Sequence, residues 1–294
     1  TVCFGGETRQ MDVNGKLVWR WFPAERVTGM PYDIPVVGYG GRNVNNLRLW
    51  SAEAYNEFDF QDFNEGSYEE AVDSKIRAEN LTKVLYPNDN IQQGKELRLR
   101  QQYFFVETLP EKVTIQLNDT HPTLVIPEMM RILVDERGVE WGKAWEITRA
   151  CVNYTNHTIL PEALEKWSVP LFRYLLPRHL QIIFDINSRF LEEVSSRYPG
   201  DLDKLRSMSV IEEGGEQSIR MANLAVIGST HVNGVAEIHS RILKEVIFKD
   251  FAEMWPGKFT NMTNGITQRR WLLFCNRPLA RLITSRIGDG WITD

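Results

Sequence analysis

The chain has 294 residues, 43% of them hydrophobic and 25% charged, which is typical of a soluble globular protein with a sizeable core. Its net charge of -5 and pI of about 5.7 argue against a nucleic-acid partner, because phosphate binding needs a basic face. The sequence also lacks an apolar run long enough to span a membrane and a recognisable signal peptide, so no membrane partner is expected.

Three cysteines, Cys3, Cys151 and Cys275, lie far apart and show no metal-ligand spacing. We therefore expect reduced thiols, as in a cytoplasmic protein, and no metal site. The chain begins at Thr1 without a methionine and stops at Asp294, and neither end has the composition of a linker. From this we expect a piece of a longer protein.

The first 48 residues are rich in glycine, proline and aromatic residues, which predicts strands and turns. Alternation between Lys16 and Phe22 predicts a strand. The prolines and glycines between Pro31 and Gly41 predict a loop.

From about Val113 the pattern changes to three units, each a strand, a polar loop and a helix. The predicted strands cover 113–117, 150–154 and 224–227, and the loops cover 118–122, 155–158 and 228–234. The predicted helices include one with an apolar face from Val125 to Leu133 and two that begin at Pro161 and about Val235, with further helix over 171–194 broken at Pro177. Strands that alternate with helices predict an α/β fold, with a largely parallel sheet and helices on both faces.

Each polar loop holds one histidine: His121, His157 or His231. Ligands of open α/β sheets bind outside the carboxyl ends of the strands, so we expect these loops at one edge of the sheet. A loop histidine can donate to a ligand hydroxyl or merely bridge loop backbone, and the sequence leaves both interpretations open. Asp119 can orient a ligand or close an Asx turn or helix cap, and these two roles are equally compatible with its position.

No nucleotide-binding phosphate loop is present. Residues 228–234 lack the Walker spacing and the G-x-G-x-x-G pattern. The cluster Arg269-Arg270-Trp271 can touch an anion, but the sequence favours a solvated helix start.

Several stretches, in this order, resemble the α-1,4-glucan (glycogen or starch) phosphorylase family. They are Pro31-Tyr-Asp-Ile-Pro35 with Val44 to Ala52, Leu85-Tyr-Pro-Asn-Asp-Asn90, Gln116-Leu-Asn-Asp-Thr-His-Pro122, Tyr154-Thr-Asn-His-Thr158, Leu176-Pro-Arg-His-Leu180, Val232-Asn-Gly-Val-Ala236 and Thr263-Asn-Gly-Ile-Thr267. The resemblance covers nearly the whole chain, and the ordered set is far more specific than any one motif.

The resemblance implies that residues 1–294 are an incomplete N-terminal lobe, a portion of a Rossmann-like lobe of a two-lobed (GT-B type) glycosyltransferase. It implies phosphorolysis of terminal glucosyl units to glucose 1-phosphate, with α-1,4-glucan and inorganic phosphate as partners. The family's pyridoxal phosphate is held by a lysine of the C-terminal lobe, whose motif is absent here. The resemblance also implies a homodimeric, cytoplasmic full-length protein and a chain that is inactive alone.

The resemblance also assigns site residues. Asp89 and Asn90 match a loop that gates the active site and contacts the glucosyl unit. Asp119 and His121 match the loop that borders the catalytic cleft, and Asn233 matches a loop residue beside the sugar. A neutral sugar offers only hydroxyls, so amide, carboxylate and imidazole groups suit its site.

One departure from the family pattern concerns catalysis. The family reads Gly-Ser-His before this region, whereas here Thr230 stands in the histidine's place and His231 follows it. His231 and Thr230 are therefore the candidate catalytic residues, and our hypothesis is that Thr230 takes the sugar contact while His231 is structural. In addition, the chain after Val106 lacks a helix and loop that family members carry, and Gln268 replaces a proline.

Two rival functions remain open at this stage. One is a nucleotide-sugar glycosyltransferase of the same architecture, such as a glycogen synthase. The other is a non-enzymatic glucan-binding module. A downstream reading frame with the Schiff-base lysine would exclude both.

Overall fold

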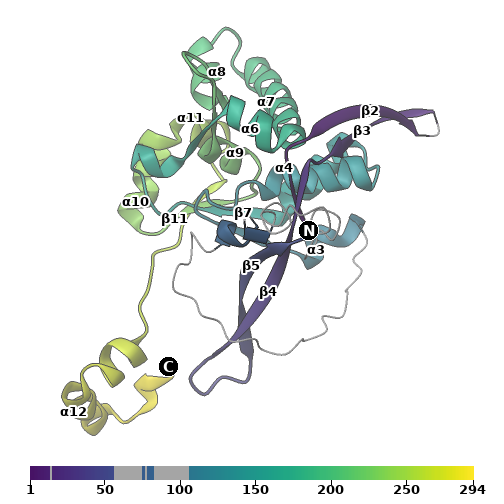
Figure 1. Cartoon of the computed structure of the whole chain (residues 1–294). Coiled ribbons are helices and arrows are strands. Elements are labelled where there is room, and N and C mark those ends of the chain that lie inside the picture. The colour runs from purple at the N-terminus through teal and green to yellow at the C-terminus, as the bar shows by residue number, and fades with distance from the viewer. Residues whose placement is uncertain (14, 56–74, 77, 83–105) are drawn as a thin grey trace, which may run out of the picture.

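Figure 1 shows the computed structural model of the chain, which describes residues 1–13, 15–55, 75, 76, 78–82 and 106–294. Its N-terminal part consists of antiparallel hairpins. The strands are β1 (Val2–Phe4), β2 (Glu7–Val13), β3 (Lys16–Phe22), β4 (Glu25–Val37) and β5 (Val44–Ala54). β2 pairs with β3, and β4 pairs with β1 and β5. The predicted strand from Lys16 to Phe22 is confirmed.

The loop predicted between Pro31 and Gly41 is wrong over its first half, because β4 continues to Val37. Pro31 and Pro35 are tolerated there because, among the described residues, this part of β4 pairs only with β5, so one side of the strand needs no N–H donors. The β4–β5 hairpin extends away from the rest of the molecule (Figure 1).

A four-stranded parallel sheet lies at the centre of the larger, C-terminal part. Its strands, in the order β12-β11-β7-β6, are β6 (Ile115–Asn118), β7 (Val152–Thr155), β11 (Val232–Gly234) and β12 (Phe259–Asn261). All three pairings are parallel. The first two strands match the first two predicted units, and the α/β class is confirmed.

Helices surround this sheet. They are α3 (Leu109–Lys112), α4 (Val125–Arg131) with η2 (Ile132–Glu136), α5 (Trp141–Cys151), α6 (Val169–Leu175), α7 (Pro177–Arg197), α8 (Leu202–Met208), α9 (Met221–Ile227), α10 (Glu237–Ile242) with η4 (Leu243–Ile247), and α11 (Lys249–Met254). Pro177 begins α7, as expected of a residue whose missing N–H costs nothing in a first turn. Buried side chains of the helices and of β6, β7, β11 and β12 form one continuous core.

The remaining described elements are short. η1 (Val106–Thr108) and η3 (Pro161–Leu164) are single turns, and β8 (Lys166–Ser168), β10 (Ser218–Arg220) and β9 (Ile211–Glu212) form a small antiparallel sheet. Within the ranges that the structure describes, no helix is both long and apolar enough to cross a membrane.

The third predicted unit is wrong in register. Residues 224–227, predicted as a strand, belong to the helix α9, whose residues are all buried. The strand is β11, which occupies part of the predicted loop. A short, fully apolar run has no periodicity that separates a buried helix from a buried strand, which explains the error.

The last part of the chain forms a separate helical module, joined to β12 by an extended segment (Figure 1). It contains η5 (Arg269–Phe274), α12 (Arg277–Ile287) and η6 (Gly290–Ile292). Gln268 donates from Nε2 to the carbonyls of Trp291 and Ile292, at 3.1 and 3.3 Å. A proline here could not make these bonds. The Gln268 side chain, where the family has a proline, therefore connects the start of the module to its end.

Candidate functional site

Polar residues gather where the parallel strands end. Asp119, Thr120 and His121 follow β6, and Asn156 and His157 follow β7. Glu165 joins them from the segment after η3. We call Asp119, His121, Asn156, His157, Glu165 and His239 the carboxyl-edge cluster.

The first half of this cluster is built on strained backbone. Asp119 and Glu165 have positive φ angles of 64° and 50°, the only such non-glycine residues in the described ranges. Positive φ is costly for residues with a side chain, and such strain concentrates at functional sites. Asp119 is buried, and its Oδ1 accepts the backbone N–H of Thr120 at 2.9 Å. The backbone N–H of Asp119 donates to Thr155 O at 2.9 Å, which joins the two loops.

Glu165 ties the loop after β6 together. Its Oε2 accepts the hydroxyl of Thr120 and lies 3.6 Å from Nδ1 of His121. The His121 side chain is 75% exposed, so its imidazole is held at the rim while most of it faces solvent. The sequence pattern did not identify Glu165 as a site residue.

A chain of hydrogen bonds through Tyr154, Asn156 and His239, which we call the relay, supports the loop after β7. Asn156 is fully buried, and its Nδ2 donates to the Tyr154 hydroxyl at 3.0 Å. Nε2 of His239 lies 2.8 Å from Asn156 Oδ1, and His239 Nδ1 accepts the N–H of Val235 at 3.1 Å. The accepting Nδ1 fixes the tautomer, so His239 is neutral and donates from Nε2.

The two halves, joined by the bond from the N–H of Asp119 to Thr155 O, also interact electrostatically. Burial lowers the pKa of His239, with a further lowering by His157, opposed by the charge of Asp119. Burial raises the pKa of Tyr154, and the Asp119 and Glu165 carboxyls raise it further. The structure therefore brings Asp119, His121 and His157 to one edge of the sheet, as predicted for His121 and His157.

Thr230 and His231 lie at the opposite edge. The N–H of Thr230 donates to Val152 O at 2.8 Å, level with the start of β7, and its hydroxyl donates to Arg149 O at 2.6 Å. The N–H of His231 donates to Asn153 Oδ1 at 3.2 Å. The prediction that these residues share an edge with His121 and His157 is wrong, because they precede their strand instead of following it.

Asn233, predicted on a loop, lies within β11. Its Oδ1 accepts the Thr155 hydroxyl at 2.7 Å, and Gln116 Nε2 donates to the same hydroxyl at 2.8 Å. These side chains form a polar row across one face of the sheet. Asp89 and Asn90 lie outside the described residues.

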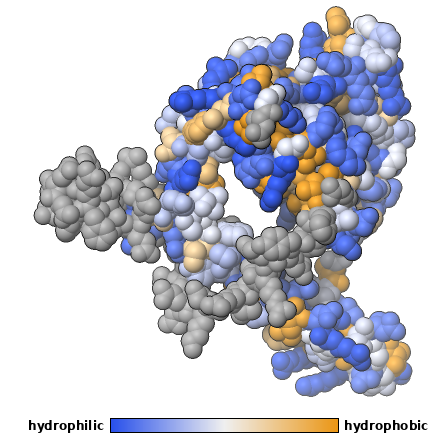
Figure 2. All heavy atoms as spheres, turned by 90° about the vertical axis from the view of Figure 1, so that its right-hand side faces the viewer, coloured by the Kyte–Doolittle hydropathy of each residue, from blue (hydrophilic) through white to orange (hydrophobic). Residues whose placement is uncertain are grey.

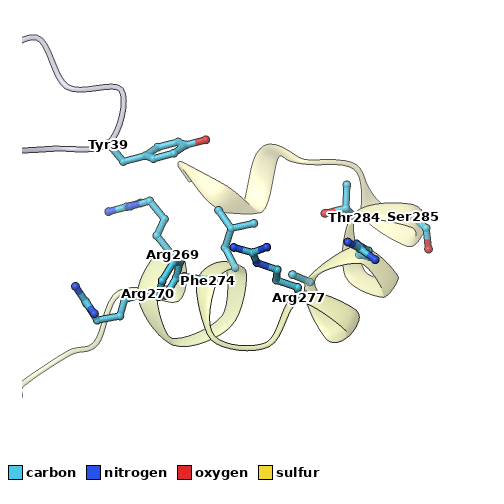
Figure 3. A pocket seen from close by; sticks show the side chains of 10 residues that line it. Tyr39, Arg269, Arg270, Phe274, Arg277, Thr284 and Ser285 are labelled. Atoms are coloured by element: carbon cyan, nitrogen blue, oxygen red, sulfur yellow. The ribbon is translucent and has the colours of Figure 1, made fainter.

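The C-terminal module carries a groove away from this cluster. It has a volume of about 830 Å³, and Figure 3 shows Tyr39, from the turn of the β4–β5 hairpin, facing Arg269, Phe274 and Arg277 across it. Arg269 donates to Ile292 O at 2.9 Å, so at least one arginine of the Arg269-Arg270-Trp271 cluster stabilises the module itself.

Comparisons with known proteins agree on one family. The family model described as carbohydrate phosphorylase matches residues 1–294. A glycogen phosphorylase from Synechocystis is 53% identical over 310 aligned positions, covering 99% of this chain and 36% of its own length. The brain form from Rattus norvegicus is 56% identical, and the muscle form from Bos taurus is 54% identical, covering 93% and 94% of this chain.

The chain thus spans 36% of the length of these curated relatives. The alignment with the Synechocystis protein is longer than the 294 residues of the chain, so that relative has residues without a counterpart here.

Proposed function

Because this chain belongs to the carbohydrate phosphorylase family, we propose that the protein acts in phosphorolysis of α-1,4-glucans, releasing terminal glucosyl units as glucose 1-phosphate. The relatives are named glycogen phosphorylases, which favours this reaction over transfer from a nucleotide sugar. The activity is proposed for a polypeptide that carries this segment together with the counterpart of the remaining length of its relatives.

The carboxyl-edge cluster is the observation that carries the proposal. A sugar presents hydroxyls that both donate and accept, and this edge offers carboxylates, imidazoles and an amide within one small region. Asp119 and His121 border the sugar in this proposal, and His157 joins them because the structure brings it to the same edge. The relay from Tyr154 through Asn156 to His239 holds the loop of His157 in place. Fixed donors and acceptors orient a substrate without reorganising during the reaction.

The proposal also keeps residues whose contribution remains a prediction. Asp89 and Asn90 are proposed to gate the site, and Asn233 to lie beside the sugar. A catalytic contact from Thr230 or His231 remains a prediction too. The bond from the Thr230 hydroxyl to Arg149 O would first have to break for Thr230 to reach a sugar.

Pyridoxal phosphate belongs to the proposal as the cofactor of the whole enzyme, but the described residues offer no fitting site. A Schiff-base lysine needs a free amine beside a cleft. Lys258 is a buried lysine, but its Nζ donates to Val226 O at 2.8 Å and lies 4.0 Å from the centre of the Trp255 ring. We therefore assign no residue of this chain to the cofactor and derive no step through it.

The finer architecture is proposed on the same support. Residues 1–294 would form an incomplete N-terminal, Rossmann-like lobe of a two-lobed enzyme that is homodimeric and cytoplasmic. The parallel sheet and the family membership support this assignment.

The test is release of glucose 1-phosphate from glycogen and inorganic phosphate by a full-length enzyme carrying this segment. We expect His157→Ala and His121→Ala to lower kcat by about 10- to 100-fold, since each removes a hydrogen-bonding group at the sugar. Thr230→Ala and His231→Ala test the opposite edge in the same assay. A loss of kcat confined to those two variants would assign the catalytic contact to Thr230 and His231. Turnover of a nucleotide sugar without phosphorolysis would refute the proposal.

A further inference from the structure

A small pocket lies between α5 and α7, on the side of the sheet where the strands begin. Its volume is about 220 Å³. The lining residues that matter here are Trp141, Trp145, Arg149, Arg189, Glu193 and Trp255. Trp141, Trp145 and Arg149 are spaced by four residues on α5, and Arg189 and Glu193 have the same spacing on α7. Each set therefore lies along one face of its helix, and that face lines the pocket. Thr230 bonds the α5 backbone at Arg149, which places the pocket at the edge opposite the carboxyl-edge cluster.

Two cations, one of them the lining residue Arg149, lie against the indole of Trp255, which also lines the pocket. The guanidinium of Arg149 lies 5.6 Å from the centre of the Trp255 ring and 6.0 Å from that of Trp145. Nζ of the buried Lys258 lies 4.0 Å from the centre of the Trp255 ring. In the part of the chain that the structure describes, neither cation forms an ion pair with a carboxylate. Glu193 interacts electrostatically with both cations, yet burial lowers the pKa of each, so their charges are only partly compensated. The aromatic contacts offset a further part of the cost of burial.

A third cation, Arg189, lines the pocket from α7. Arg189 lies over Trp141 with 5.0 Å between the guanidinium carbon and the ring centre, and its side chain is exposed. Glu140 and Asp185 interact electrostatically with Arg189, but neither forms an ion pair with it within the described residues. Glu193 is the only carboxylate among the lining residues, and it too forms no ion pair there. Positive charge therefore exceeds negative charge in the pocket.

We propose that this pocket binds a small tetrahedral oxyanion of the phosphate class, held by Arg149 and Arg189. Guanidinium groups present N–H donors in a geometry that matches phosphate oxygens. The pocket is smaller than typical sites for drug-sized ligands, which excludes an oligosaccharide and suits an ion or the phosphate of an ester. Indole walls limit water near the charges and so strengthen the attraction.

Lys258 would respond to such an anion. Burial and the neighbouring charge of Arg149 lower its pKa to about 7, with Glu193 opposing the shift. A bound oxyanion would favour the protonated amine. Binding of sulfate, whose own charge does not change near pH 7, would therefore take up a proton and strengthen as the pH falls through 7.

The experiment titrates inorganic phosphate into the full chain at constant ionic strength set with chloride and follows tryptophan fluorescence. We expect a saturable change, because three tryptophans line the pocket. Arg149→Met and Arg189→Met should each raise Kd at least tenfold, and Glu193→Gln should lower Kd by removing a repelling charge. Arg197→Met, an exposed arginine on the same helix outside the pocket, is the matched control and should leave Kd unchanged.

Two further arms identify the source of the anion. Sulfate should compete with phosphate, whereas acetate should not. Competition by glucose 1-phosphate would identify a phosphate ester as an accepted ligand, and its absence would restrict the pocket to free oxyanions. The absence of a saturable response, or an equal Kd in Arg149→Met, Arg189→Met and the unchanged chain, would overturn the inference. Should Arg149→Met fail to fold, Arg189→Met decides, since its side chain is exposed. Neither result bears on phosphorolysis, which is measured separately.

Discussion

Both ring nitrogens of His239 are engaged, which links its charge to folding. Protonating Nδ1 would set an N–H against the N–H of Val235 and break the relay to Asn156. The pKa of His239 lies below its ordinary value of 6.5 because of burial and the nearby His157. As the pH falls, the unfolded chain therefore binds this proton before the folded chain does. The contribution to stability is complete above pH 6.5 and is lost as the pH falls towards the folded-state pKa.

The prediction is that His239 titrates below 6.5 by NMR, with the proton of the neutral ring on Nε2. His239→Gln should flatten the pH dependence of the melting temperature between neutral and mildly acidic pH. His231→Gln, at an exposed histidine, is the control and should keep the slope. A His239 pKa above 6.5 would contradict this reading of the relay.

At the scale of elements, a buried ion pair joins η2 to α7. Nε and Nη2 of Arg178 donate to the two carboxylate oxygens of Asp135 at 2.7 and 2.8 Å. The two side chains are 2% and 5% exposed, and the Arg178 guanidinium lies over Trp19 of β3. The pair therefore links the β2–β3 hairpin to the helices around the parallel sheet.

Removing one partner of this pair leaves a buried charge without compensation. We expect Asp135→Leu and Arg178→Leu each to lower the free energy of unfolding by about 3–5 kcal/mol. The double variant should cost less than the sum of the two, because no charge is then left alone. Urea unfolding of the four proteins measures this, and additive losses would show that the pair does not act as a unit.

A second element-scale prediction concerns the close approach of β11 and α10. A Cβ added at Gly234 would lie 3.0 Å from both the N and the Cα of Ser240, backbone atoms that cannot rotate away. Gly234→Ala should therefore destabilise the protein by about 1–3 kcal/mol, as overpacking does. Gly257→Ala is the matched control, because nothing lies within 4 Å of its added Cβ. Equal melting temperatures for the two variants would contradict the packing argument.

At the scale of the whole molecule, apolar side chains remain on the surface of the parts that extend from the core. Figure 2 shows hydrophobic atoms reaching the surface among hydrophilic ones on the face that it views. On the β4–β5 hairpin Val37 is 71% exposed. In the segment that joins β12 to the C-terminal module Ile266 is 80% exposed, and on the module itself Phe274 is 64% exposed. Apolar surface of this kind marks a site of contact or association.

We therefore expect the chain by itself to bind a hydrophobic dye and to self-associate at micromolar concentration. Val37→Ser combined with Phe274→Ser should reduce both signals. Tyr174→Ser, at a side chain that is exposed elsewhere, should leave them unchanged. A monomeric chain that melts cooperatively without binding dye would contradict this expectation. Light scattering and dye fluorescence provide the two measurements.

The sequence by itself determined the elements that have a clear period and the family. The helix beginning at Val125, the break at Pro177 and the strand from Lys16 to Phe22 follow from local chemistry, and the structure confirms them. The ordered motifs indicated the phosphorylase family, which the family model confirms over residues 1–294. Local patterns succeed here because each choice agrees with the overall fold.

Only the tertiary structure decided which edge of the sheet each polar loop occupies. The apolar run at 224–227 fits a buried helix or a buried strand, and choosing the wrong one moved Thr230 and His231 from the start of their strand to its end. The tertiary structure also decided the contacts of Glu165 with the loop after β6 and the relay through His239, which join residues far apart in the chain. The positive φ angles of Asp119 and Glu165 accompany these contacts. Such contacts depend on which surfaces pack together, and no local period encodes that.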